Sequence, residues 1–242
     1  MTTEIEDKIQ KLKQQGNDCF HQQKYAEAMF HYTHAIKLDP KNHSLYSNRS
    51  YVFLKLQQYH FAMDDALMTI NLKPDWIKGY YRKAEVEFHT FRFNEALKSY
   101  EQALQLQPND PDILKAINRT SRSLIKDQRA DQQIPWLGAG IGIILGVIVV
   151  IADYVFTNKP TLTHPLLMAL LTISIAMLGF AIAKGFRYFV KCQRKSLLEP
   201  PIDLMNDNNQ ANDKESNNEK TTDKHPKYSK AQARQRFKKG KT

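Results

Sequence analysis

The sequence predicts an all-α protein in three parts: a stack of helix pairs, a hairpin of two apolar helices, and a disordered basic tail. Two observations support this fold class. A 34-residue period runs through the first half of the chain, and a fixed period of that length is the signature of stacked helical repeats. Two nearly uncharged stretches follow in the second half, each about as long as the ~20 residues that a membrane-spanning helix needs.

The 34-residue period is visible as five sets of three residues in one register. The sets are Pro40, Pro74, Pro108; Leu38, Leu72, Leu106; Ala28, Ala62, Ala96; Tyr25, Tyr59, Phe93; and Phe20, Leu54, Phe88. Each repeat is predicted to be two helices, in which alanines allow close packing and the proline ends the pair. The repeats span roughly 9–42, 43–76 and 77–110, and 111–130 is expected to be the helix that caps the last pair.

The order Gly16, Ala28, Tyr32, Ala35 and Pro40 within one period resembles the tetratricopeptide repeat (TPR), and the next two repeats keep most of that pattern. The resemblance covers about residues 5–130, roughly half of the chain. It implies a TPR superhelix of three helix pairs plus a capping helix, assigned to residues 1–130. It also implies that the first helix of each pair lines a concave binding groove.

Residues spaced i, i+3, i+4 and i+7 share one helix face, and this face is polar in the first helix of each repeat. Its members are Gln10, Lys13, Gln14, Asn17; then Ser44, Ser47, Asn48, Tyr51; then Lys78, Tyr81, Arg82, Glu85. Three cations and two amides stand out among them: Lys13, Asn17, Asn48, Lys78 and Arg82. This set resembles the two-carboxylate clamp of co-chaperone TPR domains at all five positions. The alternative is an ordinary solvated helix surface.

By that resemblance, Lys13, Asn17 and Asn48 would hold the terminal carboxylate of a peptide. Lys78 and Arg82 would hold the side chain of its last aspartate and the nearby backbone. These residue types suit the task, because lysine and arginine supply charge and asparagine supplies both a donor and an acceptor. The implied partners are the Glu-Glu-Val-Asp tails of the cytosolic heat-shock chaperones of 70 and 90 kDa.

Two apolar stretches predict a membrane hairpin, with helices assigned to 134–156 and 160–190. Residues 134–152 and Pro165–Ala183 carry no charge, and Trp136 and Tyr154 bracket the first stretch as aromatic residues do at a bilayer interface. Glycines at 138, 142 and 146 form a stripe on which another helix can pack closely. A hairpin buried in a soluble core is the alternative.

The cations that follow the second stretch predict the topology and the location. They are Lys184, Arg187, Lys191, Arg194 and Lys195, with no acid among them. By the positive-inside tendency, both the repeats and the tail are expected in the cytosol. The endoplasmic reticulum membrane is the expected location, and the mitochondrial outer membrane is the second choice.

The tail, residues 196–242, is rich in polar and charged residues and is expected to be a disordered cytosolic segment. Its basic end could attract anionic lipid or ribosomal RNA, and the net charge of +10 also suits an acidic partner. Cys19 and Cys192 lie far apart and have no metal-ligand spacing, so neither a disulfide framework nor a zinc site is expected.

No phosphate loop, nucleophile elbow or metalloprotease motif is present, so we expect neither an enzyme nor a cofactor. The sequence instead predicts a membrane-anchored co-chaperone adaptor. Two alternatives remain open. One is a membrane scaffold that binds its partner through the convex face of the repeats, and the other is a ribosome- or RNA-tethering protein that uses the basic tail.

Overall fold

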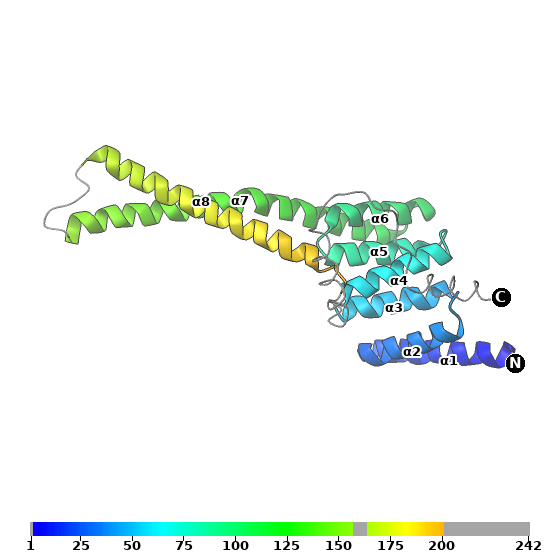
Figure 1. The fold of residues 1–242 in the computed structure, drawn as a ribbon. Coiled ribbons are helices and arrows are strands. Elements are labelled where there is room, and N and C mark those ends of the chain that lie inside the picture. Colours follow the sequence, from blue (N-terminus) through cyan, green and yellow to red (C-terminus); the bar gives the residue numbers. More distant parts are fainter. Residues whose placement is uncertain (1, 157–163, 201–242) are drawn as a thin grey trace, which may run out of the picture. The chain divides into compact units, whose positions relative to one another are not determined.

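The computed structural model describes residues 2–156 and 164–200, and every regular element within them is a helix (Figure 1). The eight helices are α1 (Thr2–His21), α2 (Tyr25–Leu38), α3 (His43–Lys55), α4 (Tyr59–Leu72), α5 (Ile77–His89), α6 (Phe93–Leu106), α7 (Pro111–Phe156) and α8 (Pro165–Ser196). The prediction of an all-α TPR superhelix is therefore confirmed.

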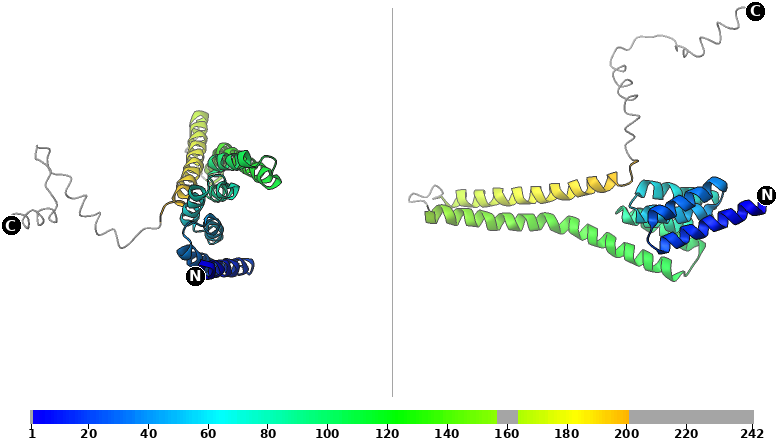
Figure 2. Two further views of the ribbon diagram at one scale, coloured as in Figure 1. Left: turned by 90° about the vertical axis from the view of Figure 1, so that its right-hand side faces the viewer. Right: turned by 90° about the horizontal axis from the view of Figure 1, so that it is seen from below.

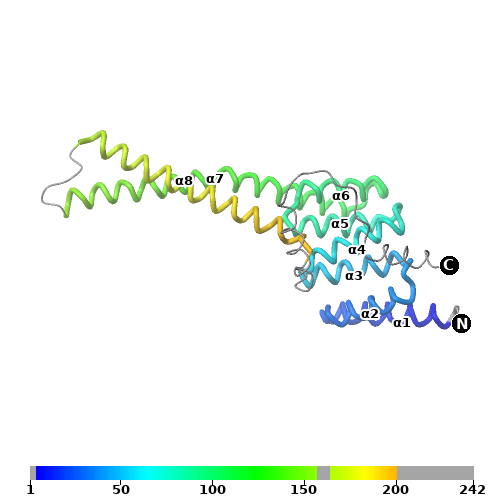
Figure 3. The backbone as a smooth tube through the Cα atoms, in the orientation of Figure 1, coloured from blue at the N-terminus to red at the C-terminus, as the bar shows by residue number. Residues whose placement is uncertain are grey.

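Helices α1 to α6 form three antiparallel pairs that stack in chain order, and α7 packs on the last pair (Figures 1 and 3). The periodic alanines explain the close packing, because Ala28, Ala62 and Ala96 are all 0% exposed. The second helices end at Leu38, Leu72 and Leu106, two residues before each periodic proline, as the sequence predicts.

The first helices of the three pairs end in the same backbone motif. Gln23, Gln57 and Phe91 all adopt positive φ, at 62°, 60° and 61°. The amide of the residue after each one donates to a carbonyl five residues back, as in Lys24 N to Cys19 O at 2.9 Å. This is a Schellman motif, whose left-handed position is usually glycine. Here the fold places two glutamines and a phenylalanine there.

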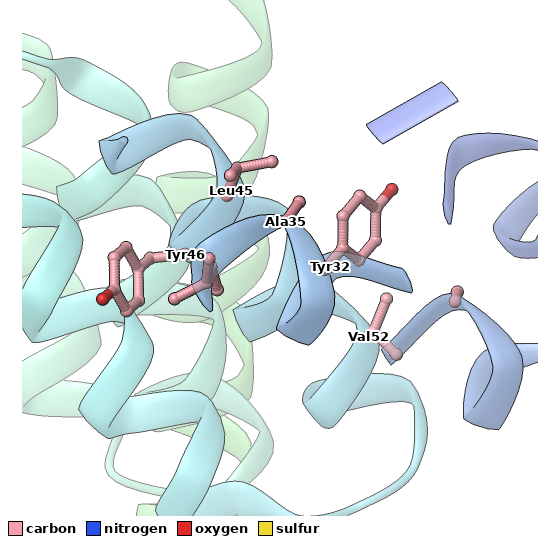
Figure 4. Packing of buried hydrophobic residues seen from close by; sticks show 7 residues of the cluster. Tyr32, Ala35, Leu45, Tyr46 and Val52 are labelled. Carbon is pink, nitrogen blue, oxygen red and sulfur yellow. The ribbon is translucent and has the colours of Figure 1, made fainter. Parts of the chain in front are cut away.

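The core of the first two repeats forms where α2 and α3 meet. Figure 4 shows Tyr32 and Ala35 of α2 beside Leu45, Tyr46 and Val52 of α3, and all five are buried. Since the second helix of one repeat packs on the first helix of the next, each interface is the same in kind. The groove-lining helices are thereby held in a fixed order.

The capping helix and the first apolar stretch are parts of one continuous helix, α7, of 46 residues. Its first three turns bury Ile113, Ala116 and Thr120 against the last repeat. Pro135 lies inside the helix, where it removes one backbone donor but does not end it. The boundary predicted between residues 130 and 134 is therefore not a break in secondary structure. The same helix packs on the last repeat before it and carries the apolar stretch after it.

Helices α7 and α8 lie side by side and antiparallel (Figure 2). The glycine stripe of α7 faces α8: a Cβ built on Gly142 would lie 2.7 Å from Ile175 O, and one on Gly146 would lie 3.1 Å from Thr172 Cα. The partner of the predicted stripe is therefore within the same chain. Gly140, on another face, would meet nothing within 4 Å.

Bulky apolar side chains of this hairpin are exposed, including Trp136 at 72% and Leu170 at 63%. By length and composition, α7 and α8 are each apolar enough to cross a membrane. The second helix runs from 165 to 196, somewhat later than the range 160–190 that the sequence predicts. Most of the predicted basic tail, 201–242, lies outside the described residues.

An ion-pair cluster joins α7 and α8 beyond the apolar stretches. Arg187 contacts both Asp127 and Asp131, Arg194 lies 2.8 Å from Asp127 Oδ1, and Lys191 pairs with Asp131. Burial would raise the pKa of Asp127, but hydrogen bonds from Arg194 and Arg187 outweigh it and hold that pKa below its usual value. The same balance, with Lys191 and Arg187 as donors, lowers the pKa of Asp131.

Candidate functional site

The five predicted clamp residues lie on the first helices of the three repeats. Lys13 and Asn17 are on α1, Asn48 is on α3, and Lys78 and Arg82 are on α5. All except Lys78 are partly buried, and Lys78 is exposed. The contacts described below connect α1 to α3 and α3 to α5 across this surface.

The Asn17 amide is held in one orientation by the second helix of its own repeat. The Tyr32 hydroxyl donates a hydrogen bond of 2.7 Å to Asn17 Oδ1. Because the amide oxygen is engaged, the other end of the amide, Nδ2, presents donors to a carboxylate. Burial raises the pKa of Tyr32 to about 12, although the neighbouring Asn48 side chain lowers it in part. Tyr32 therefore stays protonated near neutral pH and keeps donating to Asn17.

Gly16 lets Tyr32 reach this position. A Cβ on Gly16 would lie 2.7 Å from Tyr32 Cε1 and 2.9 Å from Cζ. Contacts that short are not tolerated, so any larger residue would push the tyrosine ring away. The glycine just before Asn17 is thus needed for the orientation of the asparagine.

Arg82 is fixed by two neighbours before any ligand arrives. Its guanidinium lies 4.1 Å from the centre of the Tyr51 ring, and its Nη1 donates to Glu85 Oε2 at 2.7 Å. Its Nε is buried and has no hydrogen-bond partner among the described residues. Because that atom is closed to the groove, an anionic ligand would meet the exposed part of the Arg82 side chain, which is 19% exposed.

The two lysines lie at the sides of the same surface. Lys13 Nζ donates to Ser44 Oγ at 3.2 Å, which joins α1 to α3. Lys78 Nζ lies 5.7 Å from the Trp76 ring, and Trp76 in turn stacks edge-on against His43 with ring centres 4.6 Å apart. Both ammonium groups are thus positioned by contacts that leave further donor hydrogens for a ligand.

The polar face predicted for α3 needs one correction. Ser47 is 1% exposed, and its hydroxyl has no hydrogen-bond partner among the described residues. It therefore belongs to the packing between helices and does not line the groove. Sequence reasoning also missed the role of Tyr32, although the residue is part of the repeat pattern. Its distance of 15 residues from Asn17 gave no local signal of the contact.

Taken together, the site offers fixed amide donors at one end and a fixed guanidinium at the other. Such an arrangement can bind two neighbouring anionic groups without first ordering flexible side chains. Among the described residues, no group of three His, Cys, Asp or Glu side chains could hold a metal ion.

Comparisons with known proteins agree with this fold. Residues 16–57 match the family described as TPR repeat, and residues 77–110 match the family described as tetratricopeptide repeat. The Hsp70-Hsp90 organizing protein 2 of Arabidopsis thaliana is 37% identical over 119 residues, which make up 49% of this chain and 21% of that protein. The STIP1 homolog of Dictyostelium discoideum is 42% identical over 110 residues, or 46% of this chain and 20% of that protein.

The similarity covers about half of this chain, and this chain spans about a fifth of the length of those two relatives. Serine/threonine-protein phosphatase 5 of Rattus norvegicus is also similar, at 35% identity over 127 residues, but only over 25% of its length. In each of these relatives the similarity is limited to a segment of the protein.

Two solved structures can be aligned with the repeats. The first TPR of Spaghetti (RPAP3) bound to the HSP90 peptide SRMEEVD covers 49% of this chain and 94% of its own, with a TM-score of 0.47 and 32% identity. The Sgt2 TPR domain from Aspergillus fumigatus covers 50% of this chain and 82% of its own, with a TM-score of 0.47 and 24% identity.

Proposed function

We propose that this protein is a membrane-anchored co-chaperone adaptor that binds the acidic carboxyl-terminal tails of cytosolic heat-shock chaperones. Lys13, Asn17 and Asn48 hold the terminal carboxylate, and Lys78 and Arg82 hold the last aspartate side chain. The adaptor recruits the chaperone, or a client bound to it, to the membrane in which α7 and α8 are anchored. Both chaperone classes, of 70 and 90 kDa, fit this site.

The observation that carries the proposal is the arrangement around Arg82 and Asn17. Arg82 is held in place by Tyr51 and Glu85, and Asn17 is turned by Tyr32 so that its donors are available. A solvated helix surface has no need to fix its cations and amides in this way. A site that reads a free carboxylate beside an aspartate does need it, because ordering such side chains on binding would cost affinity.

The sequence relationship supports the same ligand. A relative at 37% identity over 119 residues is named as an organizing protein for Hsp70 and Hsp90, and the family models place the repeats of this chain at residues 16–57 and 77–110. Since the chain covers only about a fifth of those proteins, their other activities are not transferred.

Calorimetry with a peptide ending in Glu-Glu-Val-Asp tests the clamp. Arg82→Ala should cost roughly 1.5–3 kcal/mol of binding, the value of a charge-assisted contact, which is about ten- to a hundredfold in affinity. Lys13→Ala should weaken binding by a similar factor. Amidating the peptide terminus should do the same from the ligand side, because it removes the charge that Lys13 recognises.

Lys37→Ala is the matched control, since Lys37 is an exposed lysine on a second helix. It removes the same charge and should leave affinity unchanged. Equal binding of free-acid and amidated peptides would contradict the clamp, and so would equal losses in Lys13→Ala and Lys37→Ala. Higher salt should weaken the wild-type complex, as expected for accessible ion pairs.

The membrane part of the proposal rests on the apolar surface of the hairpin and on the cations that follow it. The helices are long enough to span a bilayer, and their exposed residues include Trp136, Ile141 and Leu170. We propose the endoplasmic reticulum membrane, with both ends of the chain in the cytosol.

The chain should resist carbonate extraction, and protease added to sealed vesicles should remove the repeats. Protection of the repeats would overturn this topology.

A further inference from the structure

Four cations follow one face of α7 away from the clamp. They are spaced i, i+4, i+7 and i+11, which places them on one side of the helix. We call them the basic stripe: Lys115, Arg119, Arg122 and Lys126.

The basic stripe is continuous with the clamp. A cavity of about 440 Å³ between α5 and α7 is lined by Lys78 and Arg82 on one side and by Lys115 and Arg119 on the other. Asp110 and Asp112 also line it, so four cations and two acids surround this cavity. A second cavity, of about 460 Å³, is lined by Lys115 and Arg119 again and by Arg122 and Lys126. Because Lys115 and Arg119 line both cavities, the two cavities lie next to one another along α7, and the clamp residues Lys78 and Arg82 border the first of them.

The charges of the stripe are largely uncompensated within the described residues. Lys115 approaches Asp112 at 3.5 Å, but both side chains are about four-fifths exposed. Within residues 2–156 and 164–200, no acidic side chain pairs with Arg119, Arg122 or Lys126. The guanidinium of Arg119 lies 4.2 Å from the centre of the Phe88 ring, which holds it at the junction of the two cavities.

The order of the helices sets the direction of a bound peptide. With its terminal carboxylate at α1 and α3 and its last side chain at α5, the peptide is expected to continue toward α7, where the basic stripe lies. We propose that the basic stripe binds acidic residues that lie upstream of the clamp-bound end of the same tail. This inference rests on the proposed function of the clamp and adds a selection rule to it: the preferred tails carry an acidic segment before their terminal residues.

The length of the stripe defines how long that segment is. Lys115 and Lys126 are 11 positions apart, which is about 16 Å along a helix. An extended peptide covers that distance with about five residues. The four terminal residues occupy the clamp, so the acidic segment is expected within roughly the next five to eight residues of the ligand.

Binding of three peptides to the full-length chain in nonionic detergent tests this proposal. The first peptide is a short free acid that ends in Glu-Glu-Val-Asp. The second carries a five-residue extension of glutamates at its amino end, and the third carries an extension of serines. The glutamate extension should bind roughly tenfold more tightly than the serine extension, the sum of several exposed ion pairs. The difference should shrink as salt is raised.

The double variant R122A/K126A should lose most of that tenfold difference and still bind the short peptide as the wild type does. K37A/K98A is the matched control, since both lysines are exposed on second helices and the charge loss is the same.

Equal binding of the two extended peptides to the wild type would overturn the stripe while leaving the clamp intact. Failure of the short free acid to bind would overturn the clamp and, with it, the stripe. If R122A/K126A instead reduced cosedimentation with phosphatidylserine vesicles and left the peptides unaffected, the stripe would be a lipid site and this proposal would be wrong.

Discussion

In both the repeats and the hairpin, small residues allow two helices to pack closely. The large apolar side chains are buried in the repeats and exposed in the hairpin. In the repeats, Ala28, Ala62 and Ala96 allow two helices to approach, and large apolar residues such as Leu45 fill the space around them. In the hairpin, Gly142 and the other stripe glycines bring α7 against α8, while the large apolar residues point outward.

This difference is the one that our proposal of a membrane anchor predicts. A helix pair in water must hide its leucines and isoleucines, because exposed apolar area is unfavourable. A helix pair in lipid gains little from hiding them, so only close backbone packing holds the helices together. Within α7 the change occurs inside one helix: Ile113 is buried near its start, whereas Ile141 is 60% exposed. Our proposal of a membrane anchor accounts for this inversion.

Ion pairs in the two regions also differ in burial. Removing the buried one should give the largest loss of stability among the changes considered. Arg49 binds Asp65 with two hydrogen bonds of 2.7 and 2.8 Å, and the Asp65 side chain is only 6% exposed. Arg49→Met should cost about 3–5 kcal/mol, because it leaves a buried carboxylate unpaired. Arg187→Met at the base of the hairpin should cost about 1 kcal/mol or less, since Arg194 and Lys191 still pair with the two aspartates.

Thermal unfolding of the two variants in detergent, followed by circular dichroism, measures this difference. Equal losses would mean that burial does not distinguish the two ion-pair sites.

Overpacking tests the hairpin contact itself. Gly142→Val should destabilise the α7–α8 contact by about 1–3 kcal/mol, because its side chain would collide with the backbone of Ile175 and Ala176. Gly140→Val makes the same chemical change where nothing lies within 4 Å, so it should be neutral. Spin labels at positions 133 and 188, in a background with both native cysteines replaced by serine, would report a longer distance for the first variant only.

The smallest expected effect is that of acid on stability. Lowering the pH should destabilise the base of the hairpin through Asp127 and Asp131 but stabilise the repeats through Asp65. Arg194, Arg187 and Lys191 hold the pKa values of Asp127 and Asp131 below the usual 3.8, so their stabilisation is present above that pH and is lost as pH falls through the lowered values. Burial raises the pKa of Asp65 despite Arg49, so stability from this group declines as pH rises above 3.8.

A titration from pH 2.5 to 6 would separate the two, with the spin labels reporting on the hairpin and near-ultraviolet circular dichroism reporting on the repeats. Asp65→Asn should flatten only the second signal. Parallel behaviour of both signals would contradict the opposite signs.

Much of the fold could be predicted because it repeats. Any single alanine or proline is uninformative, but three of each at a spacing of 34 fix the helix pairs and their ends. The left-handed turn residues could not be predicted. Glycine is the usual residue at that position, and this chain has Gln23, Gln57 and Phe91 there. The surrounding packing sets the backbone angle at these three positions, against local preference.

The residues of the candidate clamp were also predictable, because helical spacing is enough to place Lys13 with Asn17 and Lys78 with Arg82. Their role as a carboxylate clamp remains a prediction. The spacing did not show that Ser47 is buried, since the side of a helix that contacts its neighbour depends on how the helices cross. Nor did it reveal the contact between Arg82 and Tyr51, which joins two repeats.

By itself, then, the sequence determined which residues share a helix face, since that follows from a constant turn per residue. Only the tertiary structure decided what each face meets. The structure shows that Tyr32 orients the Asn17 amide and that Gly142 packs against α8. It also shows that the cap and the first apolar stretch form one continuous helix. The physical reason is that contacts between helices depend on shape and distance across the chain, which no local period records.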